Sequence, residues 1–196
     1  RIRKDTMKIS VFGMGYVGAV SAACLLRAGH DVLGIDPNEA KIADLSQGRS
    51  PIQEPQVAEL LAAGHRAGRL KAVTEPDAGI AESDMVWVCV GTPCNVDGGL
   101  NLAAVQTVIR QIGRALRGRG VRPLLVLRST CLPGTTKECV IPQLERETAL
   151  TVGRDIDVVF HPEFLREGTG IEDFLHPPRI VVGEDRPGAA DRLLEL

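Results

Sequence analysis

Short runs of apolar and β-branched residues recur along the chain, and segments with apolar residues at helical spacing separate them. Such runs, bounded by Gly, Pro, Asn or Asp, are typical of β-strands. Two of them, Val86–Val90 and Leu124–Leu127, are almost wholly apolar, which is typical of strands covered by helices on both faces. The alternation predicts an α/β fold with a doubly wound parallel sheet, in which these two strands are central. The predicted strands are Lys8–Phe12, Asp31–Ile35, Lys71–Thr74, Met85–Val90, Arg122–Leu127, Asp157–Phe160 and Arg179–Val182.

Apolar positions spaced by three and four residues predict the helices between these strands. The clearest helix is Leu102–Leu116, with Asn101 placed to cap its first turn. Another runs from about Tyr16 to Ala28 and ends at Gly29, because glycine best tolerates the left-handed conformation that follows a helix.

The remaining helical segments are less regular. Thr135–Glu147 contains Pro142, which removes an internal hydrogen bond and is expected to kink or shorten the helix. Ala189–Leu196 begins an amphipathic helix and stops without a capping residue, so we expect the chain to be truncated before further structure. Arg1–Thr6 is polar and basic and precedes Met7, and we interpret it as a tag or upstream extension outside the fold.

Composition narrows the class of protein. The chain has 196 residues, 44% of them hydrophobic, which is enough for a buried core. Its 23 basic and 25 acidic residues give a net charge of −2, so no strong field favours nucleic acid or an anionic membrane. The longest apolar run, Met85–Val90, is far shorter than the roughly 20 residues that span a bilayer. We therefore expect a soluble protein with neither partner.

The five cysteines and four histidines are dispersed along the chain. They form no CxxC pair and no HxxxH or HExxH spacing, so the sequence predicts neither a disulfide framework nor a metal site. This cysteine usage favours a reducing cytoplasm.

The first predicted strand runs directly into Gly13-Met14-Gly15-Tyr16-Val17-Gly18 and then into a helix. This is the context that the dinucleotide-binding fingerprint G-x-G-x-x-G requires. Gly13 permits the tight turn, Gly15 lets a pyrophosphate approach the backbone, and Gly18 lets the helix lie close to the strand. The helix N-terminus adds free N–H donors and partial positive charge. The turn predicts a Rossmann-fold domain that holds a dinucleotide.

Asp36 ends the second strand, where its carboxylate can accept hydrogen bonds from the adenosine ribose and repel a 2′-phosphate. No arginine occurs within residues 37–39, so NAD is predicted in preference to NADP, although Lys41 lies one helical turn further on. FAD-binding proteins share the same turn and stay an alternative.

Ligands of doubly wound sheets bind outside the carboxyl ends of the strands at the switch point, here between the first and fourth strands. Thr92 follows the fourth strand and Thr130 the fifth, and both are predicted to face the cofactor. The alternative is that their hydroxyls only cap the loops that follow.

Five blocks together resemble one known family, and they are KISVFGMGYVGAV at 8–20, SPIQEP at 50–55, CVGTP at 89–93, RSTCLPGT at 128–135 and HPEFLREG at 161–168. Through them the chain resembles the NAD-binding domain of the UDP-glucose/GDP-mannose dehydrogenase family over essentially all of residues 7–196. Residues 89–101 and 128–135 are more similar to members that act on GDP-mannose than to members that act on UDP-glucose.

The resemblance implies oxidation of the C6 alcohol of a sugar nucleotide to a carboxylate, as from GDP-mannose to GDP-mannuronate, an exopolysaccharide precursor. This is a four-electron change, so two NAD molecules are reduced per sugar. Family members form a thiohemiacetal and then a thioester on a cysteine, and water hydrolyses the thioester. The family also implies a homo-oligomer, assembled through a central helix that lies beyond residue 196.

The resemblance further implies roles for individual residues. The implied cofactor contacts, besides the three glycines, are Tyr16, Val17, Asp36, Lys41, Thr92 and Thr130. The implied substrate contacts are Phe164, Leu165, Arg166 and Glu167. Glu167 first and Glu163 second are the candidates to orient or activate water, because thioester hydrolysis needs a positioned base. Thr130 is a further catalytic candidate. The alternative interpretation of Glu163 and Glu167 is that both are solvated loop residues without a catalytic role.

This sequence departs from the family pattern in two respects. His161 stands where the family usually has asparagine. The family's catalytic cysteine, in a Gly-Gly-x-Cys loop, and its catalytic lysine belong to a C-terminal half that these 196 residues do not include, so we expect the chain to bind NAD without turnover. Geometry alone would allow Cys94 or Cys131 as an alternative nucleophile.

Two other interpretations stay open. A β-hydroxyacid dehydrogenase has a similar first domain but uses a lysine from a later helical domain, and the blocks at 50–55 and 161–168 argue against it. The third interpretation is a non-catalytic NAD-sensing or interaction module.

Overall fold

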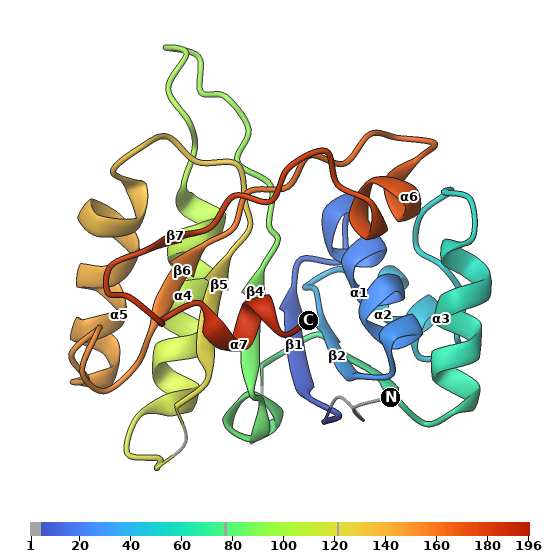
Figure 1. Ribbon diagram of the computed structural model, residues 1–196, viewed down its shortest axis with the longest axis horizontal. Coiled ribbons are helices and arrows are strands. Elements are labelled where there is room, and N and C mark those ends of the chain that lie inside the picture. The colour runs from blue at the N-terminus through green and yellow to red at the C-terminus, as the bar shows by residue number, and fades with distance from the viewer. Residues whose placement is uncertain (1–4, 77, 121) are drawn as a thin grey trace.

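The computed structural model describes residues 5–76, 78–120 and 122–196 (Figure 1). The strands are β1 (Lys8–Phe12), β2 (Asp31–Ile35), β3 (Leu70–Val73), β4 (Met85–Val88), β5 (Leu124–Leu127), β6 (Val158–Phe160) and β7 (Gly183–Glu184). The helices are α1 (Tyr16–Ala28), α2 (Glu39–Leu45), α3 (Val57–Arg66), α4 (Ala103–Leu116), α5 (Ile141–Thr148), α6 (Gly170–Leu175) and α7 (Asp191–Leu194). A 3₁₀ turn, η1 (Ala78–Glu82), precedes β4, and a π-helical turn, η2 (Thr136–Val140), precedes α5.

The strands form one seven-stranded sheet in the order β3-β2-β1-β4-β5-β6-β7. All pairs are parallel except β6 with β7, which is antiparallel. The chain order reverses between β1 and β4, so the predicted doubly wound Rossmann sheet and its switch point are confirmed. The prediction that β4 and β5 are central is also confirmed.

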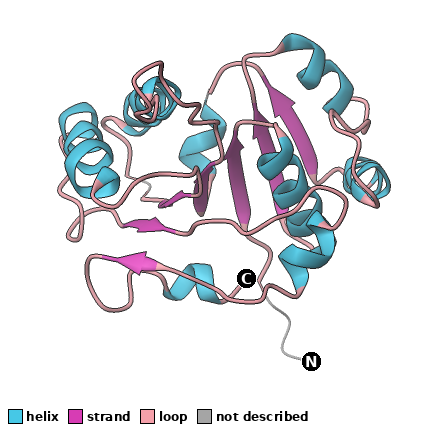
Figure 2. Ribbon diagram, turned by 90° about the horizontal axis from the view of Figure 1, so that it is seen from above, coloured by secondary structure: helices cyan, strands magenta, loops and turns pink. Residues whose placement is uncertain are grey.

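Helices cover both faces of the sheet, as Figure 2 shows. Along β4, Met85 and Trp87 pack with α1 and α3, whereas Val86 and Val88 pack with α4 and α5. All four side chains are buried, as the alternation of side chains on a strand requires when both faces are covered. This explains the continuous apolar character of the central strands.

The two clearest predicted helices are confirmed. Helix α1 has the predicted bounds, and Gly29 follows it in the left-handed conformation with φ of 96°. Helix α4 begins one residue later than predicted, and Asn101 Oδ1 accepts a hydrogen bond from the Ala103 N–H at 3.0 Å. Asn101 therefore satisfies one of the free donors of the first turn.

Pro142 divides the helical segment that was predicted over Thr135–Glu147. Residues of η2 form a wider π-helical turn, and α5 begins at Ile141 with the proline in its first turn. Proline has no N–H to donate to the preceding turn and its ring crowds the carbonyl there, which a wider turn relieves.

The strand predicted over Arg179–Val182 is wrong. These residues form a loop, and the strand at this edge is β7, which begins at Gly183. Ile180 and Val181 remain 65% and 41% exposed. Strand propensity largely reflects packing on a half-buried surface, and these β-branched side chains gain little of it.

Candidate functional site

The glycine-rich turn lies at the carboxyl end of β1, and its backbone is specific to glycine at two positions. Gly13 has φ of 88°, and its N–H donates to the Ile35 carbonyl at 2.8 Å. A Cβ on Gly18 would lie 1.9 Å from the Gly13 carbonyl oxygen, so helix and turn are in direct backbone contact. A Cβ on Gly15, in contrast, would have no described atom within 4 Å. Gly15 therefore borders open space.

Helix α1 begins at this open space, with Tyr16 and Val17 in its first turn. No side chain of the described residues caps it. The first-turn N–H groups of a helix have no partner within the helix, and they carry its partial positive charge. The turn therefore offers an anion both space and donors.

Asp36 fastens the turn to the end of β2. It is only 6% exposed, and its Oδ2 accepts a hydrogen bond from the Met14 N–H at 2.8 Å. Its Oδ1 accepts from the Asn38 N–H at 3.0 Å, and Lys41 Nζ lies 3.3 Å from Oδ2. A carboxylate has about four lone-pair sites, so capacity remains for ribose hydroxyls. The positive charge of Lys41 is directed at Asp36.

Thr92 and Thr130 come together at the carboxyl ends of β4 and β5. The Thr92 hydroxyl donates to the Thr130 carbonyl at 2.6 Å, which joins the two loops. Thr130 itself is exposed. Beyond Thr92 the chain forms a projecting loop that closes with Asn95 N–H donating to the Gly99 carbonyl at 2.7 Å (Figure 1).

The segment 161–168 leads from β6 towards α6 and places its two glutamates beside different neighbours. Glu163 Oε2 accepts a hydrogen bond from the Leu165 N–H at 2.6 Å. Burial lowers the pKa of Arg128, and the negative charge of Glu163 partly opposes this shift. Glu163 therefore interacts with Arg128, which follows β5, whereas Glu167 interacts with Tyr16 at the start of α1.

Tyr16 connects the glycine-rich turn with this segment. Its hydroxyl donates to the Arg166 carbonyl at 2.6 Å. Burial raises the pKa of Tyr16 to about 12, with further contributions from Glu54 and, to a lesser degree, Glu167 and Asp173. The phenol is therefore a stable donor at neutral pH, and Glu167 lies close enough to influence it. Phe164 and Glu167 are exposed at the surface of the segment.

His161 has a defined structural role. Its Nδ1 lies 2.9 Å from the Val181 carbonyl oxygen, and its ring meets the Trp87 ring edge-on with centroids 6.3 Å apart. Burial lowers the pKa of His161, which the hydrogen bond to Val181 partly offsets. The neutral ring with a proton on Nδ1 fits these contacts.

We expect the lowered pKa of His161 to make the free energy of unfolding depend on pH. Between the lowered pKa of the folded state and the ordinary histidine pKa of about 6.5, the unfolded chain binds more protons than the folded one, so stability should fall as the pH drops through this range. Denaturant unfolding between pH 5 and 8 measures the effect. His161→Asn should flatten the profile and His176→Asn, at an exposed histidine, should not. Identical slopes in the parent and His161→Asn would contradict the assignment.

The cysteines provide little support for a nucleophile in this chain. Burial, with a smaller effect of Cys139, raises the pKa of Cys131 to about 11, so its reactive thiolate is scarce at neutral pH. Burial also raises the pKa values of Cys24 and Cys89 to about 12. Cys94 is exposed in the projecting loop. All five are free thiols.

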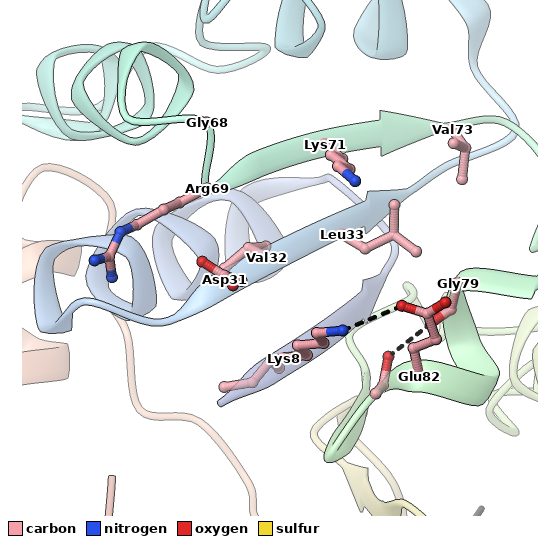
Figure 3. Close-up of a pocket in the computed structure, with 12 residues that line it drawn as sticks. Lys8, Asp31, Val32, Leu33, Gly68, Arg69, Lys71, Val73, Gly79 and Glu82 are labelled. Atoms are coloured by element: carbon pink, nitrogen blue, oxygen red, sulfur yellow. Dashed lines mark hydrogen bonds and ion pairs between the residues drawn. The ribbon is translucent and has the colours of Figure 1, made fainter. Parts of the chain in front are cut away.

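Two of the cavities in the described residues help to locate the site. Figure 3 shows one of about 380 Å³, between Lys8, Asp31 and Lys71 at the amino-terminal parts of β1, β2 and β3 and the η1 residue Glu82. Lys8 Nζ pairs there with Glu82 at 3.1 Å. Ligands of doubly wound sheets bind at the opposite, carboxyl ends, so this cavity is not the candidate site.

The other cavity, of about 320 Å³, lies beside the 161–168 segment, and Arg128 is one of the residues that line it. This arginine is 4% exposed, and its guanidinium carbon lies 5.2 Å and 5.4 Å from the ring centroids of Trp87 and Phe174. Within the described part of the chain its Nε and Nη1 have no hydrogen-bond partner. Cation–π attraction therefore holds the charge in place.

Sequence reasoning missed several residues that organise this site. Arg128 and Glu54 occur in recognised blocks without an assigned role, and Asp173 lies outside the five blocks. Glu54 binds two backbone amides of the segment that follows Glu167, and Asp173 binds Arg166. The one sequence signal for Arg128 and Glu54 is that each is a charged residue within a block that is specific to the family.

The residues present fit a bound dinucleotide. The turn combines an open position at Gly15, an uncapped helix N-terminus for a pyrophosphate and a buried carboxylate at the end of β2 for a ribose. These features define the class: a Rossmann-fold domain that binds a dinucleotide.

Comparison with known proteins specifies the class further. The sequence pattern of the UDP-glucose/GDP-mannose dehydrogenase family, NAD binding domain, matches residues 7–196, and the chain belongs to this family. The resemblance inferred from the five blocks and the prediction of NAD as cofactor are thereby confirmed.

Curated relatives include GDP-mannose 6-dehydrogenase of Azotobacter vinelandii, 45% identical over 97% of this chain and 44% of the relative. UDP-glucose 6-dehydrogenase AglM of Haloferax volcanii is 38% identical over the same shares. The chain therefore spans less than half the length of these relatives.

Solved structures give the same result. The GDP-mannose dehydrogenase of Pseudomonas aeruginosa, in a ternary complex, is 45% identical with a TM-score of 0.94, over 96% of this chain and 43% of that one. The UDP-glucose dehydrogenase of Pyrobaculum islandicum is 37% identical with a TM-score of 0.91, over 100% and 44%.

Two features are absent from the described residue ranges, a membrane-spanning helix and a cluster of metal ligands. No helix in those ranges is long and apolar enough to cross a membrane. No group of three or more His, Cys, Asp or Glu side chains in the same residues could hold a metal ion.

Proposed function

We propose that this chain is the NAD-holding half of a nucleotide-sugar 6-dehydrogenase that oxidises GDP-mannose to GDP-mannuronate. The observation that carries the proposal is the hydrogen bond from Tyr16, in the cofactor turn, to the Arg166 carbonyl, in the segment expected to meet the sugar nucleotide. This hydrogen bond keeps the cofactor turn and the 161–168 segment together. The 45% identity to GDP-mannose 6-dehydrogenases supports GDP-mannose as the sugar nucleotide.

In this function the chain's own residues bind and orient. The amides of the glycine-rich turn hold the pyrophosphate, and Asp36 accepts the ribose hydroxyls. NAD, when bound, accepts the hydride. Thr92 and Thr130 border the nicotinamide end, where the hydrogen bond between them holds their two loops together. Residues 164–167 contact the sugar nucleotide, and the exposed Glu167 carboxylate orients the hydrolytic water. The free cysteines support a reducing cytoplasm as the place of action.

A titration and an assay test the proposal together. The 196-residue chain should bind NAD more tightly than NADP by calorimetry and should form no NADH with GDP-mannose. The protein encoded by the complete reading frame around this chain should reduce two NAD per GDP-mannose. UDP-glucose should be a poor substrate in parallel assays. Preference for UDP-glucose would support the UDP-glucose 6-dehydrogenase alternative.

Two other outcomes would overturn the proposal. NAD binding without turnover of either sugar nucleotide by the complete protein would favour a non-catalytic NAD-binding module. Robust NADH formation by the 196-residue chain alone would place the nucleophile within this chain.

A further inference from the structure

The SPIQEP block forms the connection between α2 and α3 and lies far from β6 in sequence, yet it contacts the end of the 161–168 segment. Glu54 Oε2 accepts a hydrogen bond from the Gly168 N–H, and Oε1 accepts one from the Gly170 N–H, both at 2.8 Å. One carboxylate thus binds two backbone amides. Hydrogen bonds to a charged acceptor are the stronger kind.

Tyr16 fixes the same segment on the other side of Glu167. Its hydroxyl donates to the carbonyl of Arg166, the preceding residue. Gly170 packs so closely on the phenol that a Cβ there would lie 2.5 Å from the hydroxyl oxygen. The backbone before Glu167 is therefore bound to Tyr16, and the backbone after it is bound to Glu54.

Asp173 provides a third set of contacts to the segment, and these do not involve Glu167. Arg166 Nη2 lies 2.7 Å from Asp173 Oδ1, and its backbone N–H donates to Oδ2 at 3.0 Å. The Thr169 hydroxyl also donates to Asp173 Oδ2 at 2.9 Å. None of these three anchors uses the Glu167 side chain, which remains exposed.

We propose that Glu54 is a positioning residue: together with Tyr16 it holds the backbone on both sides of Glu167 against the cofactor turn, so that the Glu167 carboxylate is presented to the reacting carbonyl. The inference rests on the proposed function, in which Glu167 orients water. It also assigns a role to the SPIQEP block. The role requires a carboxylate, because two oxygens are needed to accept from two amides.

The step that this position serves is hydrolysis of the thioester formed on a cysteine of the other half. The water oxygen bonds to the thioester carbonyl carbon, the carbon–sulfur bond breaks, and the sulfur leaves as a thiolate. The water proton passes to the Glu167 carboxylate. No electrons are transferred in this step, because both hydrides have already reduced two NAD molecules.

Amide hydrogen exchange by NMR on the 196-residue chain tests the contact. Glu54→Gln keeps the shape but offers one acceptor oxygen, so exchange at Gly168 or Gly170 should accelerate about 10-fold or more, while amides of β1 and β4 stay within about twofold. Glu59→Gln is the matched control, because it removes the same charge from an exposed position on α3. Should Glu54→Gln fold poorly, Glu54→Asp probes the same two contacts with a shorter carboxylate. Unchanged exchange at both glycines would overturn the proposal.

Transient kinetics of the complete protein test the positioning role. Glu54→Gln should give a rapid burst of two NADH per site and then a steady-state rate about 10-fold lower, since only hydrolysis depends on Glu167. A purely structural defect would lower burst amplitude and steady rate together, and that result, or an unchanged kcat, would overturn the positioning role. If the parent forms no NADH, the proposed function fails, while the exchange measurement still decides whether Glu54 holds the segment.

Discussion

Gly18→Ala should be among the most destabilising single-methyl substitutions in this chain. The added Cβ would lie 1.9 Å from the Gly13 carbonyl oxygen and 3.0 Å from its carbon, and both are backbone atoms. Relief requires α1 to move away from β1. We expect a loss of about 3 kcal/mol in the free energy of unfolding, or about 10 °C in Tm for a domain of this size, from thermal and denaturant unfolding.

Gly15→Ala provides the matched control, because it adds the same methyl group to the same turn. Gly15 has φ of −81°, which alanine adopts without strain, and no described atom would contact the new Cβ. Stability should stay within about 0.5 kcal/mol. NAD affinity should nevertheless fall about 10- to 100-fold, because the methyl group occupies space for the pyrophosphate. Equal stability of the two variants would contradict the structure, and unchanged NAD affinity of Gly15→Ala would contradict the cofactor position.

Asp36→Ala should lower NAD affinity about 100-fold, because charge-assisted hydrogen bonds to the ribose are each worth about 1.5–3 kcal/mol. It should also destabilise the free chain by about 1–3 kcal/mol, because the buried Met14 N–H loses its acceptor. Calorimetric titration and denaturant unfolding measure the two effects separately.

Asp36→Asn distinguishes charge from shape. It retains one acceptor oxygen but removes the anion that repels a 2′-phosphate, and it releases Lys41 from its ion pair. The ratio of NAD affinity to NADP affinity should therefore fall clearly, whereas the free energy of unfolding should change little. Glu39→Gln, an exposed change of the same charge nearby, should alter neither. Undiminished discrimination in Asp36→Asn would show that other residues select the cofactor.

Local patterns predicted most of the fold. The bounds of α1 depend on a glycine turn before it and Gly29 after it, and continuous apolar runs mark β4 and β5, so each is encoded within a short segment. The edge strand was mispredicted because the β-branched residues of 179–182 indicate burial that the tertiary structure does not provide. Pro142 predicted that its helix would be kinked or shortened, but it did not predict the π-helical turn that precedes α5.

The contacts that organise the site could not be predicted from sequence in the same way. Glu54 and Gly168 are 114 positions apart, and neither residue type indicates a partner at that distance. Arg128 contradicts the usual tendency of arginine to lie at the surface, and aromatic rings on separate elements accommodate it. The glycine-rich turn and Asp36 were recognisable because a dinucleotide imposes similar local chemistry on unrelated sequences.

Trp87 is the single tryptophan of the chain, and its surroundings make it a natural spectroscopic probe. Its ring meets His161 at the start of the 161–168 segment and stacks near Phe174, which lies beyond the end of that segment, with the Arg128 charge close by. Indole emission is sensitive to such neighbours. Ligand-induced displacement of the segment should therefore change the intrinsic fluorescence, so that its movement can be followed in real time without an attached dye.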